Sequence, residues 1–185
     1  LSVLCLFFAL WAEQCVSVLP TAHADTVAGL CWAPHQPHLV ISGCSAGSLI
    51  AHDIRQNGGK AWQLSLHTPE WTGGVCALSA LGSSVAVGCS GGVVVLVDPR
   101  AHSVLSRCVA HTDDVRGISE DGTIAQGAGA GTGAGAAPLL CTASFDGTAG
   151  VWALEGGTQE STGRSPSTRS PTRASTSTRL ISRAP

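Results

Sequence analysis

The sequence predicts an all-β fold made of repeated units, and three observations lead to this prediction. The apolar residues are mostly Val, Leu and Ala in short runs, 23 glycines punctuate the chain, and similar motifs recur about every 44 residues. Short apolar runs between glycine turns are typical of brief strands. Because 44% of the 185 residues are hydrophobic and only 12% are charged, the chain can form a folded core.

The repeat is clearest when two segments are aligned. Residues 23–55 and 111–154 both begin with the pattern His-x-Asp-x-Val, and both continue with an apolar strand, a Ser/Gly/Asp turn and a second apolar strand. Residues 73–100 follow the same order without the His. The last unit is longer because a Gly/Ala-rich tract, 125–137, is inserted between its strands, where extra loop length costs little stability. A stable period of this size indicates a repeat architecture.

These units resemble WD40 repeats over roughly residues 14–155. The resemblance implies an all-β WD40 β-propeller that is present in part, as about three to three and a half blades at 23–66, 73–109 and 111–155. The apolar segment 1–13 is then expected to belong to a preceding blade. Because a propeller must close to hide its sheet edges, we expect this chain to be part of a longer protein.

The resemblance also gives a structural role to four polar residues of the last unit. In the family, a His, a Ser or Thr, an Asp and a Trp of one blade form a buried hydrogen-bonded chain. The matching residues here are His111, Thr142, Asp146 and Trp152. Burying these groups is costly unless each has a hydrogen-bond partner, so the chain of contacts is expected to fix the blade geometry.

The other two units depart from this pattern. The first keeps His23 and Ser42 but has Ala46 and His52 where the Asp and Trp are expected. The middle unit has Trp71 near the expected His, and it lacks the Asp and the Trp. These two blades are therefore expected to hold together by apolar packing of runs such as HLVISG and VVVLV, buried on both faces.

The sequence predicts no enzyme, no cofactor and no metal site. A catalytic reading of the polar residues in the last unit would need an exposed nucleophile and an oxyanion hole, and neither is indicated. The spacing of Cys31, His35, His38 and Cys44 fits no zinc knuckle. The eight cysteines stand singly without a CxxC pair, which favours free thiols in a reducing compartment, the cytoplasm or the nucleus.

The two ends of the chain differ from the body. Residues 1–160 carry five Lys and Arg against twelve Asp and Glu, a net charge of −7, whereas 161–185 carry five Arg and no acid. The tail, 156–185, is rich in Ser, Thr, Arg and Pro and is expected to be disordered. The acidic body argues against specific nucleic-acid binding. The apolar start is too short to span a bilayer, although a secreted protein with a signal peptide remains an alternative.

A repeat scaffold of this class is expected to bind other proteins. The connection after the first unit and the Val-Asp pair at 97–98 resemble methylosome WD-repeat subunits, the non-catalytic partners of type II arginine methyltransferases that help to present histones and Sm proteins. The Asp-x-Arg pairs ending at Arg55 and Arg100 instead resemble the box by which WD40 receptors bind cullin-type ubiquitin ligases. Trp71, in a Pro/Gly-flanked loop, is a third candidate partner contact.

Overall fold

The computed structural model describes residues 4–9, 14–20, 23–56, 59–120, 139–155 and 179–182, and only their backbone at 4–18, 20, 154–155 and 179–182. Within these ranges the regular structure is a two-stranded hairpin, three four-stranded antiparallel sheets and two short 3-10 helices, Ile54–Gln56 and Ser90–Gly92. We call the sheets β3–β6, β7–β10 and β11–β14 the first, second and third blades.

The strands of each blade follow one another in chain order from the inner to the outer edge. The hairpin pairs β1 (Leu4–Ala9) with β2 (Gln14–Pro20). The first blade contains β3 (Val27–Trp32), β4 (Leu39–Cys44), β5 (Ser48–Asp53) and β6 (Gly59–Ser65). The second contains β7 (Val75–Leu81), β8 (Ser84–Cys89), β9 (Val93–Asp98) and β10 (Ser103–Val109). The third contains β11 (Val115–Glu120), β12 (Leu139–Ser144), β13 (Ala149–Glu155) and β14 (Arg179–Ser182).

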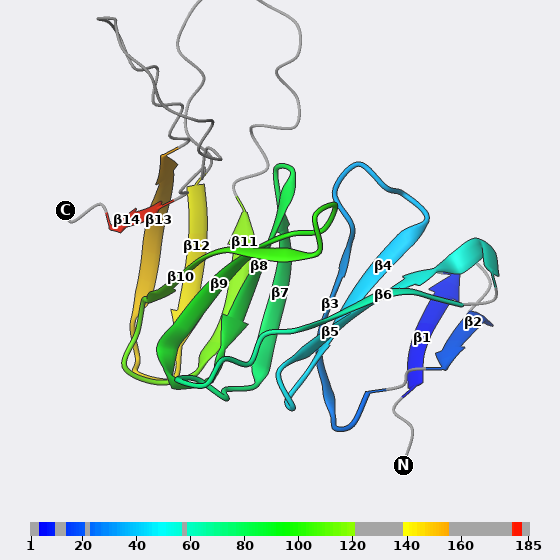
Figure 1. Ribbon diagram of the computed structural model, residues 1–185, viewed down its shortest axis with the longest axis horizontal. Coiled ribbons are helices and arrows are strands. Elements are labelled where there is room, and N and C mark those ends of the chain that lie inside the picture. The colour runs from blue at the N-terminus through cyan, green and yellow to red at the C-terminus, as the bar shows by residue number, and fades with distance from the viewer. Residues whose placement is uncertain are drawn as a thin grey trace, which may run out of the picture.

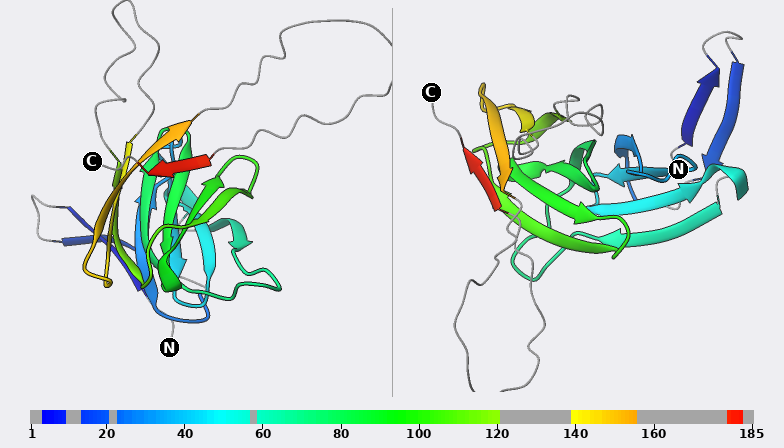
Figure 2. Two further views of the ribbon diagram at one scale, coloured as in Figure 1. Left: turned by 90° about the vertical axis from the view of Figure 1, so that its left-hand side faces the viewer. Right: turned by 90° about the horizontal axis from the view of Figure 1, so that it is seen from above.

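The blades stand side by side along an arc, with the hairpin next to the first blade on the side away from the second (Figures 1 and 2). Neighbouring blades meet through their inner strands, β3 against β7 and β7 against β11. The same irregularity recurs where each inner strand pairs with the next strand: the register skips Ala28, Cys76 and Arg116. The period seen in the sequence is therefore also a period of the backbone.

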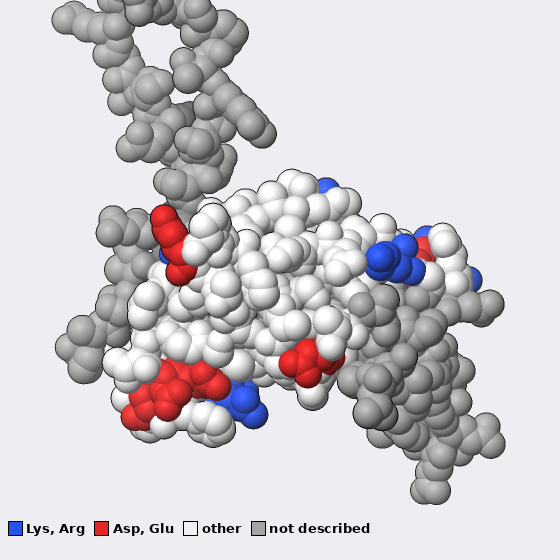
Figure 3. All heavy atoms as spheres, turned by 60° about the horizontal axis from the view of Figure 1, so that its bottom comes forward, with Lys and Arg blue, Asp and Glu red and all other residues white. Residues whose placement is uncertain are grey.

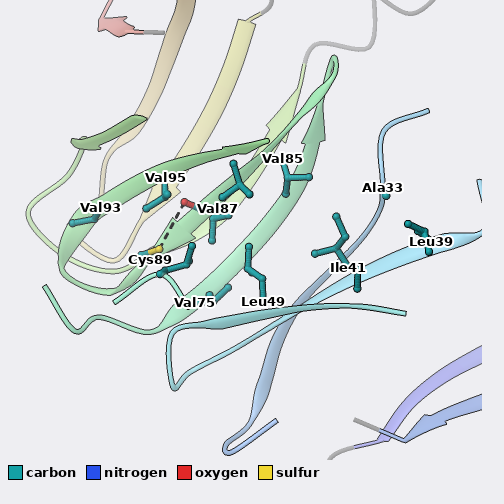
Figure 4. Close-up of a cluster of buried hydrophobic side chains, with 13 residues drawn as sticks. Ala33, Leu39, Ile41, Leu49, Val75, Val85, Val87, Cys89, Val93 and Val95 are labelled. Atoms are coloured by element: carbon teal, nitrogen blue, oxygen red, sulfur yellow. Dashed lines mark hydrogen bonds between the residues drawn. The ribbon is translucent and has the colours of Figure 1, made fainter. Parts of the chain in front are cut away.

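Two apolar layers fill the spaces between the blades. The layer between the first and second blades includes Ile41, Leu49, Val87 and Val95 (Figure 4). The layer between the second and third blades includes Val94, Leu96, Val115 and Leu140. Alternate residues of β9 thus belong to different layers, because successive side chains of a strand point to opposite faces. The VVVLV run is buried on both faces.

A glycine with positive φ sits in the turn between the second and third strands of every blade. These residues are Gly47 (φ 73°), Gly92 (φ 75°) and Gly147 (φ 81°). At Gly92 a Cβ atom would clash with the carbonyl group of His111. The backbone N–H groups of Ala110 and His111 both donate to the Gly92 carbonyl oxygen. The glycine is required there because the approach to the next blade passes directly over the turn.

The outer strand of the third blade lies where the sequence predicts a disordered tail. β14 pairs antiparallel with β13, from Trp152 opposite Ser182 to Glu155 opposite Arg179. The prediction for 156–185 is therefore wrong for these four residues, and the rest of that tail lies outside the described residues. The Gly/Ala-rich tract 125–137 is also outside them. In the segment expected to belong to a preceding blade, β1 pairs with β2.

Candidate functional site

The four polar residues of the third blade meet in one hydrogen-bonded network. Nε2 of His111 lies 2.7 Å from Oγ1 of Thr142, and the indole N–H of Trp152 donates to the same oxygen at 2.8 Å. Nδ1 of His111 lies 3.2 Å from Oδ2 of Asp146 and 2.9 Å from the hydroxyl oxygen of Thr148. The network joins the loop before β11 to β12, β13 and the turn between them.

This network is suited to holding the blade together rather than to catalysis. The Thr142 side chain is buried and its oxygen is already engaged by two partners. Hydrogen bonds from the Thr148 hydroxyl and from the Thr112 backbone N–H lower the pKa of Asp146. The carboxylate therefore stays ionised and accepts hydrogen bonds from the loop that leads into the blade.

The first blade has a related network that contains the two residues retained from the pattern, His23 and Ser42, together with His52, whose part the sequence analysis missed. Nε2 of His23 lies 2.8 Å from the Ser42 hydroxyl oxygen, and Nε2 of His52 lies 3.3 Å from that oxygen. His52 thus takes the place of the Trp, because an imidazole N–H can point where an indole N–H would. Nδ1 of His23 lies 3.3 Å from Oγ of Ser48, the equivalent of Thr148. The expected apolar packing is present in this blade, where Ile41 and Leu49 are buried, and the polar network adds to it.

The middle blade has valines in place of the network. Val87 and Val97 occupy the positions of the Ser and the Trp and belong to the layer between the first and second blades. In this blade His67, rather than Trp71, occupies the backbone position that His111 has in the third blade. The Leu66 N–H, just before His67, donates to the Gly47 carbonyl oxygen, and the Ala110 N–H, just before His111, donates to the Gly92 carbonyl oxygen in the same way. For this blade the apolar packing expected from the sequence is what the structure shows.

The ring of Trp71 is held against the blade. It is half-buried on the layer between the first and second blades, and the guanidinium of Arg107 lies 4.7 Å from the ring centre. The same guanidinium donates to the Leu66 carbonyl oxygen at 2.6 Å and to the Thr68 hydroxyl at 3.2 Å. The loop 66–74 is therefore clamped onto β10, and Trp71 is only partly available to a partner.

The two candidate arginines differ in their surroundings. Arg55 donates to both carboxylate oxygens of Asp53, from Nε at 3.1 Å and from its terminal nitrogen at 2.9 Å. This contact lowers the pKa of Asp53 to about 2. The Arg100 side chain is exposed, and among the described residues it makes no hydrogen bond or ion pair. Only Arg100 is thus free of a local partner in the described part of the chain.

One end of the three blades forms a face of loops and turns, which we call the loop face. It comprises the loops 23–26, 66–74 and 110–114 and the turns 45–47, 90–92 and 145–148. These segments contain five acidic residues and no Lys or Arg; the acids are Asp25, Glu70, Asp113, Asp114 and Asp146. Figure 3 looks toward this end of the molecule and shows red areas with a smaller blue area beside the largest. The face is acidic overall.

A depression of about 530 Å³ opens on the loop face, where the inner strands of the three blades begin. Ser45 and Ser90 from the turns and Asp114 from the loop before β11 line it. So do the three residues that the strand register skips, Ala28, Cys76 and Arg116. A bulge turns an extra side chain out of the regular alternation of its strand. Each blade therefore contributes one bulge residue to this depression.

Phe145 is a surface feature that the sequence analysis missed. Its side chain is 65% exposed at the tip of the β12–β13 turn, and the guanidinium of Arg116 lies 4.8 Å from the ring centre. The equivalent position of the first blade is Ser45. The signal in the sequence was an aromatic residue in a Ser/Gly/Asp turn, but its exposure depended on the fold. Phe145 and Arg116 place an aromatic–cation pair beside the depression.

Cysteines and possible metal ligands are dispersed. Within the described side chains, Cys31, Cys44, Cys76, Cys89, Cys108 and Cys141 are free, and no group of three or more His, Cys, Asp or Glu is arranged to hold a metal ion. Burial raises the pKa of Cys31 and of Cys89 to about 12. In the part of the chain that the structure describes, no helix has the length and apolar character needed to cross a membrane.

Comparison with known proteins gives structural matches only. No family model matches the sequence. No curated protein matches it either. The solved structure of U3-55K superposes with a TM-score of 0.56 at 18% identity, covering 72% of this chain and 37% of that one. A chain of the mitotic checkpoint complex gives 0.59 at 18% identity, covering 78% and 39%.

These matches define the fold and the extent of the likeness. At 18% identity the likeness concerns the fold alone. This chain spans about two fifths of the length of each matched chain, 37% and 39%. Its antiparallel sheets succeed one another in chain order, and together with the two structural matches this confirms the predicted fold class: the chain has a WD40 β-propeller-type fold.

Proposed function

We propose that this chain is a non-catalytic protein-interaction scaffold whose loop face binds a basic segment of a partner protein. The observation that carries the proposal is the depression of about 530 Å³ at the shared end of the three blades. The loops and turns around it contain five acidic residues and no Lys or Arg, and the lining of the depression adds one basic residue, Arg116 of β11. An acidic face attracts basic partners over a distance, and complementary charge favours the correct register of binding.

The arginine methyltransferase complex is the partner we propose. The resemblance of residues 53–78 and 85–118 to methylosome WD-repeat subunits supports it, and so does the acidic loop face, because histones are basic. The chain would hold such a substrate while the methyltransferase modifies it. This role requires no nucleophile, cofactor or metal ion in the chain itself.

Peptide binding tests the loop face directly. A labelled arginine-rich peptide is titrated with the full chain and followed by fluorescence anisotropy, beside a peptide of equal length with Gln at every Arg. We expect only the first to bind, and its affinity to fall as salt is added. The double variant Asp25→Lys with Asp113→Lys should weaken binding about fivefold, which corresponds to roughly 1 kcal/mol.

The control for this experiment is Glu120→Lys, at the other end of β11, which changes the charge by two units, as the single variant Asp113→Lys does; the double variant changes it by four. Glu120 is the last residue of β11, and the strand begins at the loop face, so Glu120 lies at the opposite end. Its carboxylate accepts a hydrogen bond from the Gly82 N–H at 3.1 Å. It should leave peptide binding nearly unchanged. Equal weakening by both substitutions would show that only net charge matters and would refute a site on the loop face.

Capture with purified proteins distinguishes the proposed partner from a ligase adaptor. The full chain is immobilised and exposed separately to a type II arginine methyltransferase and to the adaptor of a cullin-type ubiquitin ligase. We expect the methyltransferase to be retained. Retention of the adaptor alone, lost on Arg100→Ala, would support the ligase alternative instead, since Arg55, the arginine of the other pair, is already bound to Asp53.

A further inference from the structure

The third blade has an aromatic residue at a turn position where the other two blades have serine. Phe145 stands two residues before the positive-φ glycine of its turn, as Ser45 and Ser90 do in theirs. Its ring is 65% exposed, and it does not belong to either apolar layer between the blades. Because serine serves the same turn in two blades, the turn itself does not require the aromatic ring.

The cation that covers this ring comes from the bulge of β11. The guanidinium carbon of Arg116 lies 4.8 Å from the centre of the Phe145 ring, within the range of a cation–π contact. The equivalent bulge residues of the other blades are Ala28 and Cys76, and neither carries a positive charge. Both members of the aromatic–cation pair are therefore particular to the third blade, although the pairing of its strands requires neither.

The guanidinium of Arg116 is held without a carboxylate. Its side chain is exposed, and within the described residues it forms no ion pair with an Asp or Glu. It also interacts with the thiol of Cys76: burial and the Asp114 carboxylate raise the pKa of that thiol, and Arg116 opposes them. An exposed cation–π contact is weak, so this guanidinium can leave the ring when another cation competes for it.

The ring, in contrast, is fixed in place beside an acidic group. The Phe145 N–H donates to the Asp114 carbonyl oxygen at 3.0 Å. The neighbouring Ser144 hydroxyl donates to the Asp113 carbonyl oxygen at 2.9 Å. In the Asp114 carboxylate, Oδ1 accepts from the Gly91 N–H at 3.0 Å, whereas Oδ2 accepts no hydrogen bond from the described residues. An aromatic face thus stands next to a carboxylate oxygen that can still accept.

We propose that the ring of Phe145 is an arginine-binding position, which Arg116 occupies in the free chain and which an arginine of the bound partner takes over. This inference rests on the proposed function and names the side chain that the loop face selects within a basic segment. A guanidinium is planar and can stack on the ring while its N–H groups reach a carboxylate such as that of Asp114. The ammonium group of a lysine is compact and strongly hydrated, so it gains less from the same ring.

Peptides that differ only in their cation test the position. Three labelled peptides of equal length, with Arg, Lys or Gln at the same places, are titrated with the full chain and followed by fluorescence anisotropy. We expect the Arg peptide to bind about twofold to fivefold more tightly than the Lys peptide, as one exposed cation–π contact allows. Equal binding of these two, both tighter than the Gln peptide, would overturn the arginine position and leave the proposed function standing. If neither binds more tightly than the Gln peptide, both ideas fail.

Two variants copy the other blades at the two positions and should therefore fold. Phe145→Ser should remove the preference for the Arg peptide over the Lys peptide. Arg116→Ala should widen that preference, because it frees the ring. The control is Arg100→Ala, which removes an exposed arginine just after β9, at the other end of the blades, and should affect both basic peptides alike. An unchanged preference in Phe145→Ser, or one in Arg116→Ala no wider than in Arg100→Ala, would overturn the proposal.

Discussion

The hydroxyl of Thr142 is the single atom on which most of the third-blade network depends. It accepts from Trp152 at 2.8 Å and lies 2.7 Å from His111. Thr142→Val keeps the shape but leaves both partners buried without it, so we expect a loss of about 1–3 kcal/mol in unfolding free energy. Chemical denaturation measures it, and Thr142→Ser is the matched control. Equal stability of the Val and Ser variants would contradict a bonded role for the hydroxyl.

Replacing Trp152 removes both a hydrogen bond and a large apolar group. The ring packs against the layer between the second and third blades and donates to Thr142. Trp152→Ala should therefore cost about 3–5 kcal/mol, as for other aromatic residues removed from a core. The midpoint of denaturation is the measurement. A variant that unfolds with the parent would show that the network does not support the blade.

Asp146 makes the stability of the third blade depend on pH in the acid range. Its pKa in the folded state lies below the usual 3.8, mainly through the Thr148 hydroxyl. The carboxylate therefore stabilises the fold fully above about pH 4, and this contribution is lost as the pH falls further. Stability measured across this acid range should decline less steeply in Asp146→Asn, which is already less stable near neutral pH. Parallel curves for both proteins would contradict this account.

Residue roles were predictable where a polar pattern was complete. The positions of His111, Thr142, Asp146 and Trp152 follow from the pattern, and the structure places them within hydrogen-bond distance. The role of His52 could not be predicted, because the sequence of the first unit shows only that the Trp of the pattern is missing. Whether an imidazole N–H can reach the same hydroxyl depends on the register of β4 and β5.

At the scale of elements, the strands and turns were more predictable than the outer strand of the third blade. Apolar runs and glycine turns locate the strands of the first and second blades. β14 could not be found this way because it is four residues long, follows 23 intervening residues and lies in an Arg-rich segment. Its pairing with β13 depends on an open edge that exists only after the other three strands have formed.

The contribution of β14 can be measured by truncation. Ending the chain after residue 178 removes β14 and exposes the edge of β13, so amide exchange of 149–155 should become faster. Ending it after residue 182 keeps the strand and removes a terminal Arg, which makes it the matched control. If both truncations exchange alike, β14 does not protect that edge in solution.

The Gly/Ala-rich tract is expected to be a passive insertion. It connects Glu120 of β11 to Leu139 of β12, and these strands pair regularly from Glu120 opposite Leu140 onward. Replacing 125–137 with a short Gly/Ser turn should change the unfolding free energy by less than about 1 kcal/mol, because closure entropy varies slowly with length. A larger loss in denaturation experiments would mean that the tract packs against the blades.

At the scale of the whole molecule, the chain is an arc of blades with apolar residues exposed on the first and third of them. Leu30 on β3 is 43% exposed and Val151 on β13 is 47% exposed. We expect the isolated chain to self-associate, as exposed apolar sheet surface promotes. Light scattering after size exclusion should show oligomers of the parent chain. The double variant Leu30→Lys with Val151→Lys should form fewer of them. A matched Val104→Lys in the middle blade should have little effect, and a stable monomer of the parent would contradict this prediction.

The three bulge residues lie on the surface of the depression and take no part in the regular strand pairing. Ala28, Cys76 and Arg116 all line the depression, yet none is needed for the regular pairing of its strand. The chemistry of this opening can therefore vary one blade at a time while the scaffold stays constant. Ala28→Arg should change stability by less than about 0.5 kcal/mol in denaturation, as for other surface substitutions, while weakening the binding of basic peptides at the opening. Recognition in this protein can diverge through three positions that the core does not constrain.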